Sequence, residues 1–115
     1  PIDVAIDPSL GNVYVADSGN NNIQKFSPNG TYITSWGTEG SQNGQFRVPS
    51  GLDTDASGNV YVADRYNNRI QEFSPNGTYI TSWGTEGSEN GQFKTPLGVT
   101  IDGHSGNVFV ADSSK

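Results

Sequence analysis

The chain has 115 residues, with 12 acidic and 6 basic side chains, a net charge of −6 and no cysteine or methionine. The acidic balance argues against binding to nucleic acid or to anionic membranes, because both require a basic surface. No apolar run approaches the roughly 18 residues that insert across a bilayer. The lack of cysteine excludes disulfides and thiolate zinc sites. Because the sequence starts without methionine, we expect it to be part of a longer translation product.

Short segments rich in β-branched and aromatic residues follow one another along the chain, separated by Gly, Pro, Asn and Asp. Such segments predict strands. The predicted strands lie near Val4, over 12–17, 23–27 and 31–36, near Leu52, over 59–64, 70–74 and 78–83, near Val99, and over 107–112. Helices are disfavoured because turn-forming residues interrupt every few positions. Asn-Gly pairs at 29–30 and 76–77, each preceded by proline, predict tight hairpin turns.

The order of these segments repeats. Residues 11–57 and 58–104 are identical at 34 of 47 aligned positions, and a third copy starts at Gly106. Each full repeat supplies four strands, which we expect to form an antiparallel meander. The strand over 12–17 and its copies are apolar on both faces, so each sheet should lie between two others. Four-stranded sheets at this spacing are typical of propeller blades, and the sequence therefore predicts an all-β fold of such blades.

The string "NGQFRVPSGLDTDASGNVYVADRYNNRIQEFSPNGTYITSWGTEGSENGQF", residues 43–93, resembles NHL repeats, which build six-bladed and related β-propellers. The resemblance makes 1–115 a single propeller segment, with repeat one at 1–46, repeat two at 47–93 and the two inner strands of a third at 94–115. Repeat one departs from the pattern at Asn22 and Asp3. The resemblance implies an interaction platform more often than an enzyme. A few relatives are lyases whose metal is held by histidines in the central channel.

In a meander, alternate turns lie at opposite ends of the sheet. The turns at 18–21 and 65–68 and the connections that start at Gly37 and Gly84 therefore share one side, called the loop face below. Loops gathered on a rigid scaffold are the default binding surface, and Arg and Tyr are enriched among residues that dominate binding. We predict that a protein or carbohydrate ligand binds here. The candidate residues are Asn20, Asn21, Glu39, Arg65, Tyr66, Asn67, Asn68 and Glu86.

The glycine-rich connection "GTEGSQNG" at 37–44 suggests a phosphate or calcium loop. However, it lacks the lysine of phosphate-binding loops, and no helix follows it. It carries one acid, Glu39, where a calcium loop needs several oxygen ligands. We interpret it as a connector between blades, with Phe46 anchored between the sheets.

Aspartates end the inner strands of every repeat. Asp7, Asp55 and Asp102, joined by Asp53, could line one mouth of a channel and attract a cation; we favour the alternative that they cap turns. A second set, Asp17, Asp64 and Asp112, ends the next strands. We expect these carboxylates to accept hydrogen bonds from the turns that follow, with Arg69 paired to Asp64.

His104 is the single histidine, whereas a histidine zinc site needs several nitrogen ligands. We therefore predict a non-catalytic binding or scaffold module without a cofactor. A metal-dependent lyase and a carbohydrate-binding, lectin-like propeller remain the alternatives. With two full repeats and half of a third, the chain should either continue as a longer propeller or bury its open faces by self-association. An extracellular or cell-surface location is slightly favoured.

Overall fold

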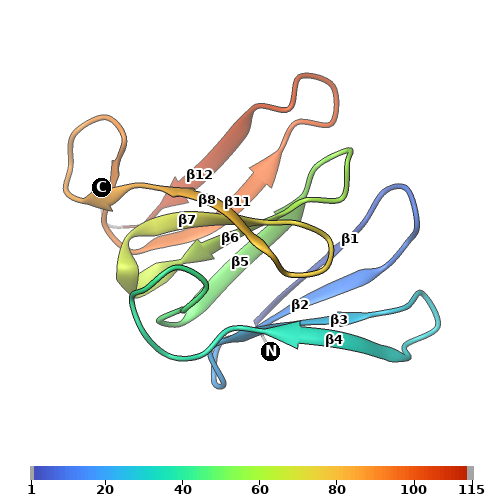
Figure 1. Cartoon of the computed structure of the whole chain (residues 1–115). Helices are drawn as coiled ribbons and strands as arrows, with labels where there is room; N and C mark the ends of the chain where they lie inside the picture. Colours follow the sequence, from blue (N-terminus) through green and yellow to red (C-terminus); the bar gives the residue numbers. More distant parts are fainter. Residues whose placement is uncertain (1, 114–115) are drawn as a thin grey trace.

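The computed structural model describes residues 2–113 and arranges them as a fan of three stacked β-sheets (Figure 1). The first sheet has the strand order β1-β2-β3-β4, the second β5-β6-β7-β8, and the third β11-β12. Every neighbouring pair in these three sheets is antiparallel. The predicted all-β fold of four-stranded meanders is confirmed. The strands are β1 Asp3–Ile6, β2 Val13–Asp17, β3 Asn22–Phe26, β4 Tyr32–Trp36, β5 Pro49–Thr54, β6 Val60–Asp64, β7 Arg69–Phe73, β8 Tyr79–Trp83, β11 Pro96–Ile101 and β12 Val108–Asp112.

The second sheet lies between the other two, and its strand β6 is covered on both faces. Val60 and Val62 belong to the core shared with the first sheet, which includes Tyr14. Tyr61 and Ala63 belong to the core shared with the third sheet. Because successive side chains of a strand point to opposite faces, a strand that is apolar at every position is what this double burial requires. The prediction of a sheet between two sheets is confirmed.

The first connection between sheets, residues 37–48, begins with a close approach of backbone and ring. Gly37 has φ +108°, and a β-carbon there would lie 2.6 Å from the Phe46 ring. Phe46 is fully buried, and its ring centroid lies 5.6 Å from that of Phe73. Only glycine fits both the space and the backbone conformation. The predicted role of this segment as a connector with an anchored phenylalanine is confirmed.

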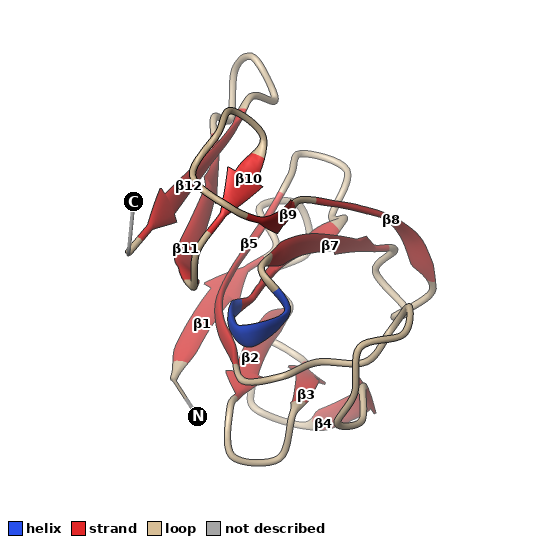
Figure 2. Ribbon diagram, turned by 90° about the vertical axis from the view of Figure 1, so that its left-hand side faces the viewer, coloured by secondary structure: helices blue, strands red, loops and turns tan. Residues whose placement is uncertain are grey.

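Two local features are absent from the sequence-based prediction (Figure 2). One is the short 3₁₀ helix η1, Arg65–Asn67. The other is a parallel pair of two-residue strands, β9 Thr85–Glu86 and β10 Gln92–Phe93, inside the second connection, residues 84–95. In the described part of the chain no helix has the length and apolar character needed to cross a membrane.

Candidate functional site: the loop face

The loop face is organised around the carboxylate of Asp64, at the end of β6. This side chain is fully buried, and Arg69 Nε lies 2.8 Å from its Oδ2 atom. The same oxygen accepts hydrogen bonds from Asn67 Nδ2 at 2.9 Å and Gln71 Nε2 at 3.1 Å. Its other oxygen accepts the backbone N–H of Arg47 at 2.7 Å. A buried charge needs this degree of pairing, because an uncompensated one is costly.

The donors around Asp64 also hold the first connection in place. Arg69 donates to the carbonyl groups of Ser41, Gln42 and Gln45 at 2.8–3.1 Å. Asn67 donates to Gly40 O at 2.8 Å. We call this set of contacts the latch: the Asp64, Asn67, Arg69 and Gln71 side chains bound to residues 40–47. The latch fixes a glycine-rich segment through side-chain hydrogen bonds to its backbone carbonyl groups.

Gln71 is the member of the latch that the sequence-based prediction missed. Its side chain is fully buried; its amide nitrogen donates to Gln45 O at 2.7 Å, and its oxygen accepts the Gly44 N–H at 3.0 Å. The signal was present as a polar residue repeated on a strand, at Gln24 and Gln71. A polar side chain kept inside an apolar strand pattern indicates a buried hydrogen-bonding role.

The pairing of Asp64 with Arg69 is confirmed, but the expected donors of Asp64 need correction. The sequence predicts donors, the backbone N–H groups among them, from the turn that follows the strand. The backbone donor is instead Arg47, in the connection that precedes the sheet, and the following turn contributes the side chain of Asn67. Asp112 repeats this arrangement, since its Oδ1 atom accepts the Lys94 N–H at 2.9 Å. Asp64 and Asp112 therefore secure the entry of the chain into the second and third sheets.

Two of the candidate asparagines, Asn21 and Asn68, bind the connections just before the second and third sheets. Asn21 and Asn68 have positive φ values of 54° and 56°. Each accepts, through its side-chain oxygen, a backbone N–H of the following connection at 2.8 Å: Val48 for Asn21 and Thr95 for Asn68. Asparagine tolerates the left-handed conformation better than most residues. These amides, with Asn67, form contacts within the chain, and their predicted role in ligand binding stays a prediction.

The remaining candidates are accessible to a ligand. Glu39 and Glu86 are exposed on the two connections, and Asn20 is exposed where it donates to Asp17 Oδ2 at 2.9 Å. Tyr66 is 51% exposed on η1, and the Arg65 guanidinium lies 5.1 Å from its ring centroid. Backbone hydrogen bonds from Arg65 to Val48 O and from Tyr66 to Arg47 O fix this turn on the connection. The loop face thus presents a cation stacked on an aromatic ring from a constrained backbone.

The opposite end of the sheets carries the weak metal candidates. Asp7 accepts the Ser9 N–H at 3.0 Å, Asp55 the Ser57 N–H at 2.9 Å and Asp102 the His104 N–H at 3.0 Å. The prediction that these aspartates cap turns is confirmed. Within residues 2–113 no three His, Asp or Glu side chains gather closely enough to hold a metal ion.

Two aspartates and two tyrosines have shifted pKa values. The side-chain hydrogen bond from Asn20 lowers the pKa of Asp17, and the backbone N–H of His104 lowers the pKa of Asp102, since both favour the ionised carboxylate. Burial raises the pKa of Tyr14 to about 12, with the nearby Asp7 charge adding to it. Burial also raises the pKa of Tyr61, assisted by its hydrogen bond to Asp55.

Stacked antiparallel meanders, joined by latched connections, are the blades of a β-propeller. Comparison with known proteins agrees. The NHL repeat matches residues 1–26 and 46–73. Over 57 residues the chain is 53% identical to peptidyl-glycine alpha-amidating monooxygenase B of Xenopus laevis, a match that covers 45% of this chain and 6% of that protein. The chain therefore carries NHL repeats.

Solved structures support the same architecture. A protein of unknown function from Bacteroides thetaiotaomicron superposes with a TM-score of 0.81 at 20% identity, over 95% of this chain and 32% of its own. A streptogramin B lyase superposes with a TM-score of 0.68, also at 20% identity, over 93% of this chain and 32% of its own. The chain thus spans about a third of each structure, and the likeness concerns the fold.

Proposed function

We propose that the loop face is a non-catalytic interaction surface of an NHL propeller module and that it binds a protein ligand. The observation that carries the proposal is the Arg65–Tyr66 pair. Tyr66 is 51% exposed and Arg65 is partly exposed. The guanidinium lies 5.1 Å from the ring centroid, and the pair replaces Ser18 and Gly19 of the first repeat. Arg and Tyr are enriched among the residues that dominate binding energy at interfaces.

The backbone hydrogen bonds from Arg65 to Val48 O and from Tyr66 to Arg47 O support the proposal, because they hold this pair against the connection that the latch fixes. A surface that is ordered before binding loses less conformational entropy when a ligand arrives. The Arg65 guanidinium suits a carboxylate of the partner, and the Tyr66 ring suits an apolar or aromatic side chain. A partner segment that offers both is the ligand chemistry that this arrangement fits.

The experiment selects ligands from a displayed peptide library on the immobilised chain and measures the affinity of the selected peptides. A double variant, Arg65→Ser with Tyr66→Gly, gives the second repeat the residues of the first. We expect it to bind the peptides at least about tenfold more weakly. His104→Ala, at the opposite end of the sheets, is the matched control and should bind like the parent. Equal binding by the double variant would refute the proposal, and a glycan array with the same variants tests the carbohydrate alternative.

Catalysis is the second candidate, because the 53% identical relative is an enzyme that acts, by its name, on peptidyl-glycine. Mass spectrometry of a peptide ending in glycine, incubated with the purified chain, tests this candidate directly. The metal content of the same preparation should be measured in parallel. An unmodified peptide is expected from a non-catalytic module. Turnover together with stoichiometric metal would replace the proposed function by an enzymatic one.

A further inference from the structure

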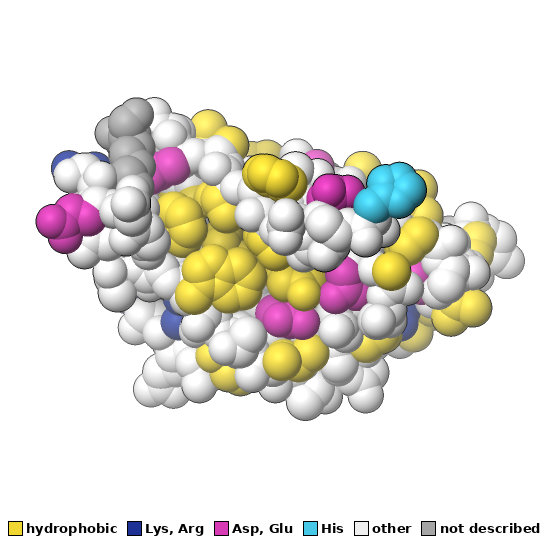
Figure 3. All heavy atoms as spheres, turned by 90° about the horizontal axis from the view of Figure 1, so that it is seen from above, with side chains coloured by type: hydrophobic (Ala, Val, Ile, Leu, Met, Phe, Trp, Pro, Cys, Tyr) yellow, Lys and Arg dark blue, Asp and Glu magenta, His cyan; other side chains and the backbone are white. Residues whose placement is uncertain are grey.

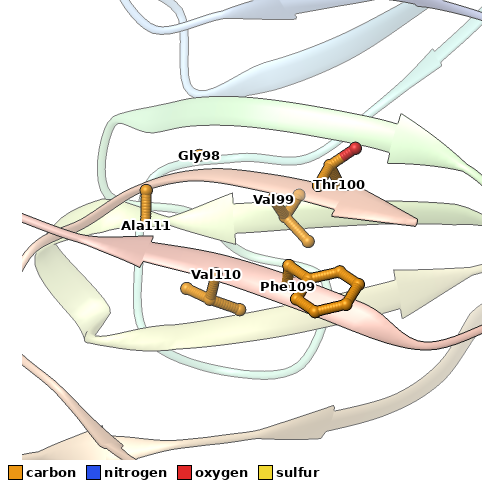
Figure 4. A pocket seen from close by; sticks show the side chains of 6 residues that line it. All are labelled: Gly98, Val99, Thr100, Phe109, Val110 and Ala111. Carbon is orange, nitrogen blue, oxygen red and sulfur yellow. The ribbon is translucent and has the colours of Figure 1, made fainter. Parts of the chain in front are cut away.

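The fan of sheets has two outer faces that are apolar and open in the described residues. Face 1, on the first sheet, consists of Val4, Ile6, Val13 and Val15. Face 3, on the third sheet, consists of Gly98, Thr100, Phe109 and Ala111. Face 3 forms a shallow hollow along β11 and β12 (Figure 4), and Figure 3 shows apolar side chains exposed on the side of the molecule that is seen from above. Neither set contains a charged side chain.

The chain contains, twice, the contact that would cover these two faces. In the first contact, Tyr14 and Ala16 of β2 pack in one core with Val60 and Val62 of β6. In the second, the next copies of these residues make the same contact: Tyr61 and Ala63 of β6 pack with Val108 and Val110 of β12. Each contact therefore joins an aromatic-alanine face of one sheet to a valine face of the next.

Faces 1 and 3 match the two sides of these contacts, but no sheet covers either face in the described residues. Phe109 and Ala111 stand at the third-copy positions of Tyr14 and Ala16, so face 3 is an aromatic-alanine face. Val13 and Val15 stand at the first-copy positions of Val60 and Val62, so face 1 is a valine face. The strand register is the same, since Val4 pairs with Val15 as Leu52 pairs with Val62 and Val99 with Val110.

Burial separates the used from the unused faces. Leu52 is 3% exposed, whereas Val4, its counterpart on face 1, is 57% exposed. Tyr14 is fully buried, whereas Phe109, its counterpart on face 3, is 57% exposed. Sequence and register are thus matched on the used and unused faces, and the difference is the presence of a covering sheet. Exposed apolar patches of this kind mark interaction surfaces.

We propose that copies of this chain associate head to tail, with face 3 of one copy packed against face 1 of the next. Phe109 then takes the place that Tyr14 and Tyr61 occupy within the chain, over the valines of the next sheet. The two faces differ from one another, so the contact is heterologous. A heterologous contact produces a closed ring if its rotation closes, and an open array if it does not.

The experiment measures the mass of the 115-residue chain by light scattering over a range of concentrations. Val4→Glu places a charge on face 1, and Phe109→Glu places one on face 3. Both side chains are more than half exposed in the single chain, so the variants should keep the parent's circular dichroism and urea midpoint. Each should weaken association at least about tenfold. Ile80→Glu is the matched control: Ile80 is 47% exposed on β8, outside both faces, and its variant should associate like the parent.

A mixture of the two variants tests the direction of the contact. The Val4→Glu copy keeps an intact face 3, and the Phe109→Glu copy keeps an intact face 1. Head-to-tail packing predicts that the mixture forms a one-to-one dimer, although neither variant associates alone. A monomeric parent chain at high concentration would overturn the proposal. So would persistent association of either variant alone, because that would mean that a face packs on its own copy or that another surface is used.

Discussion

Asp17 and Asp64 end equivalent strands in two repeats that are identical at 34 of 47 positions, yet their surroundings differ. Asp64 is fully buried and is bound by Arg69, Asn67, Gln71 and the Arg47 backbone. Asp17 is partly exposed, and its described partners include the side chains of Asn20 and Gln24. In the described residues, a connection covers this carboxylate in the second repeat, and the carboxylate of the first repeat is partly exposed.

Removing the carboxylate should give the largest difference between the two sites in the free energy of unfolding. Asp64→Ala removes the acceptor that the Arg69 guanidinium, the Asn67 and Gln71 amides and the Arg47 backbone N–H share. We expect the free energy of unfolding to fall by about 3 kcal/mol or more. Asp17→Ala is the matched control, with a much smaller loss, because water can replace its partners. Urea denaturation of both variants measures the difference. Equal losses would mean that the latch contributes nothing beyond the shared strand position.

Exchanging Arg69, one of the residues that differ between the repeats, weakens the latch more selectively. Arg69→Asn gives the second repeat the residue that the first has at Asn22, and it removes the Arg69 donors from Asp64 and three carbonyl groups. Hydrogen bonds to charged groups contribute about 1.5–3 kcal/mol each, of which the exposed ones contribute less. We therefore expect a loss of about 2 kcal/mol in the free energy of unfolding, measured by urea denaturation.

The Arg69→Asn variant should also make the first connection, residues 37–48, more mobile. A glutamate-specific protease is expected to cleave faster after Glu39 in Arg69→Asn than in the parent chain. The reverse exchange, Asn22→Arg, creates a pair at a partly exposed aspartate and should change the free energy of unfolding by about 1 kcal/mol or less. Unchanged cleavage at Glu39 would show that the connection is held by contacts other than the latch.

Substitution of Gln71, a buried member of the latch, should reduce the free energy of unfolding by a smaller amount. Gln71→Ala removes two hydrogen bonds to Asp64 and Gln45 O and the acceptor of the Gly44 N–H. We expect a loss of about 1.5 kcal/mol and faster hydrogen exchange of the Gly44 amide, measured by NMR. Gln24→Ala, at the equivalent partly exposed position, is the control and should lose clearly less. Unchanged exchange at Gly44 would count against the contact.

The smallest effect concerns the titration of Asp17. The Asn20 hydrogen bond lowers the pKa of this carboxyl in the folded chain. The sign follows from linkage: the stabilisation is present above the unfolded-state pKa and is lost as the pH falls through the lower folded-state value. Asn20→Ala should move the NMR titration midpoint of Asp17 upward, whereas Asn67→Ala should leave it unchanged. A midpoint that does not respond to Asn20→Ala would contradict this assignment.

The sequence was sufficient to predict the strands and their order, because turn residues and two-faced strands recur at a fixed spacing. The Asn29-Gly30 and Asn76-Gly77 hairpins, the buried Phe46 and the Asp64–Arg69 pair all follow from local patterns. The latch could not be predicted from local patterns, because the residues that it joins are 17 to 28 positions apart in the sequence. Backbone carbonyl groups such as Gly40 O leave no trace in composition. Equivalence of the repeats also hid the difference between Asp17 and Asp64, which arises from packing.

The latch also has a direction along the chain. Residues 40–47 dock on side chains at positions 64–71, which are later in the sequence. During synthesis, which proceeds from the N-terminus, the first connection can become fixed only after β6 and β7 have left the ribosome. Until then its four glycine and asparagine residues lack the side chains of the latch. The connection that ends the first repeat is thus fixed by side chains of the second, so it stays unsecured until that second sheet has been made.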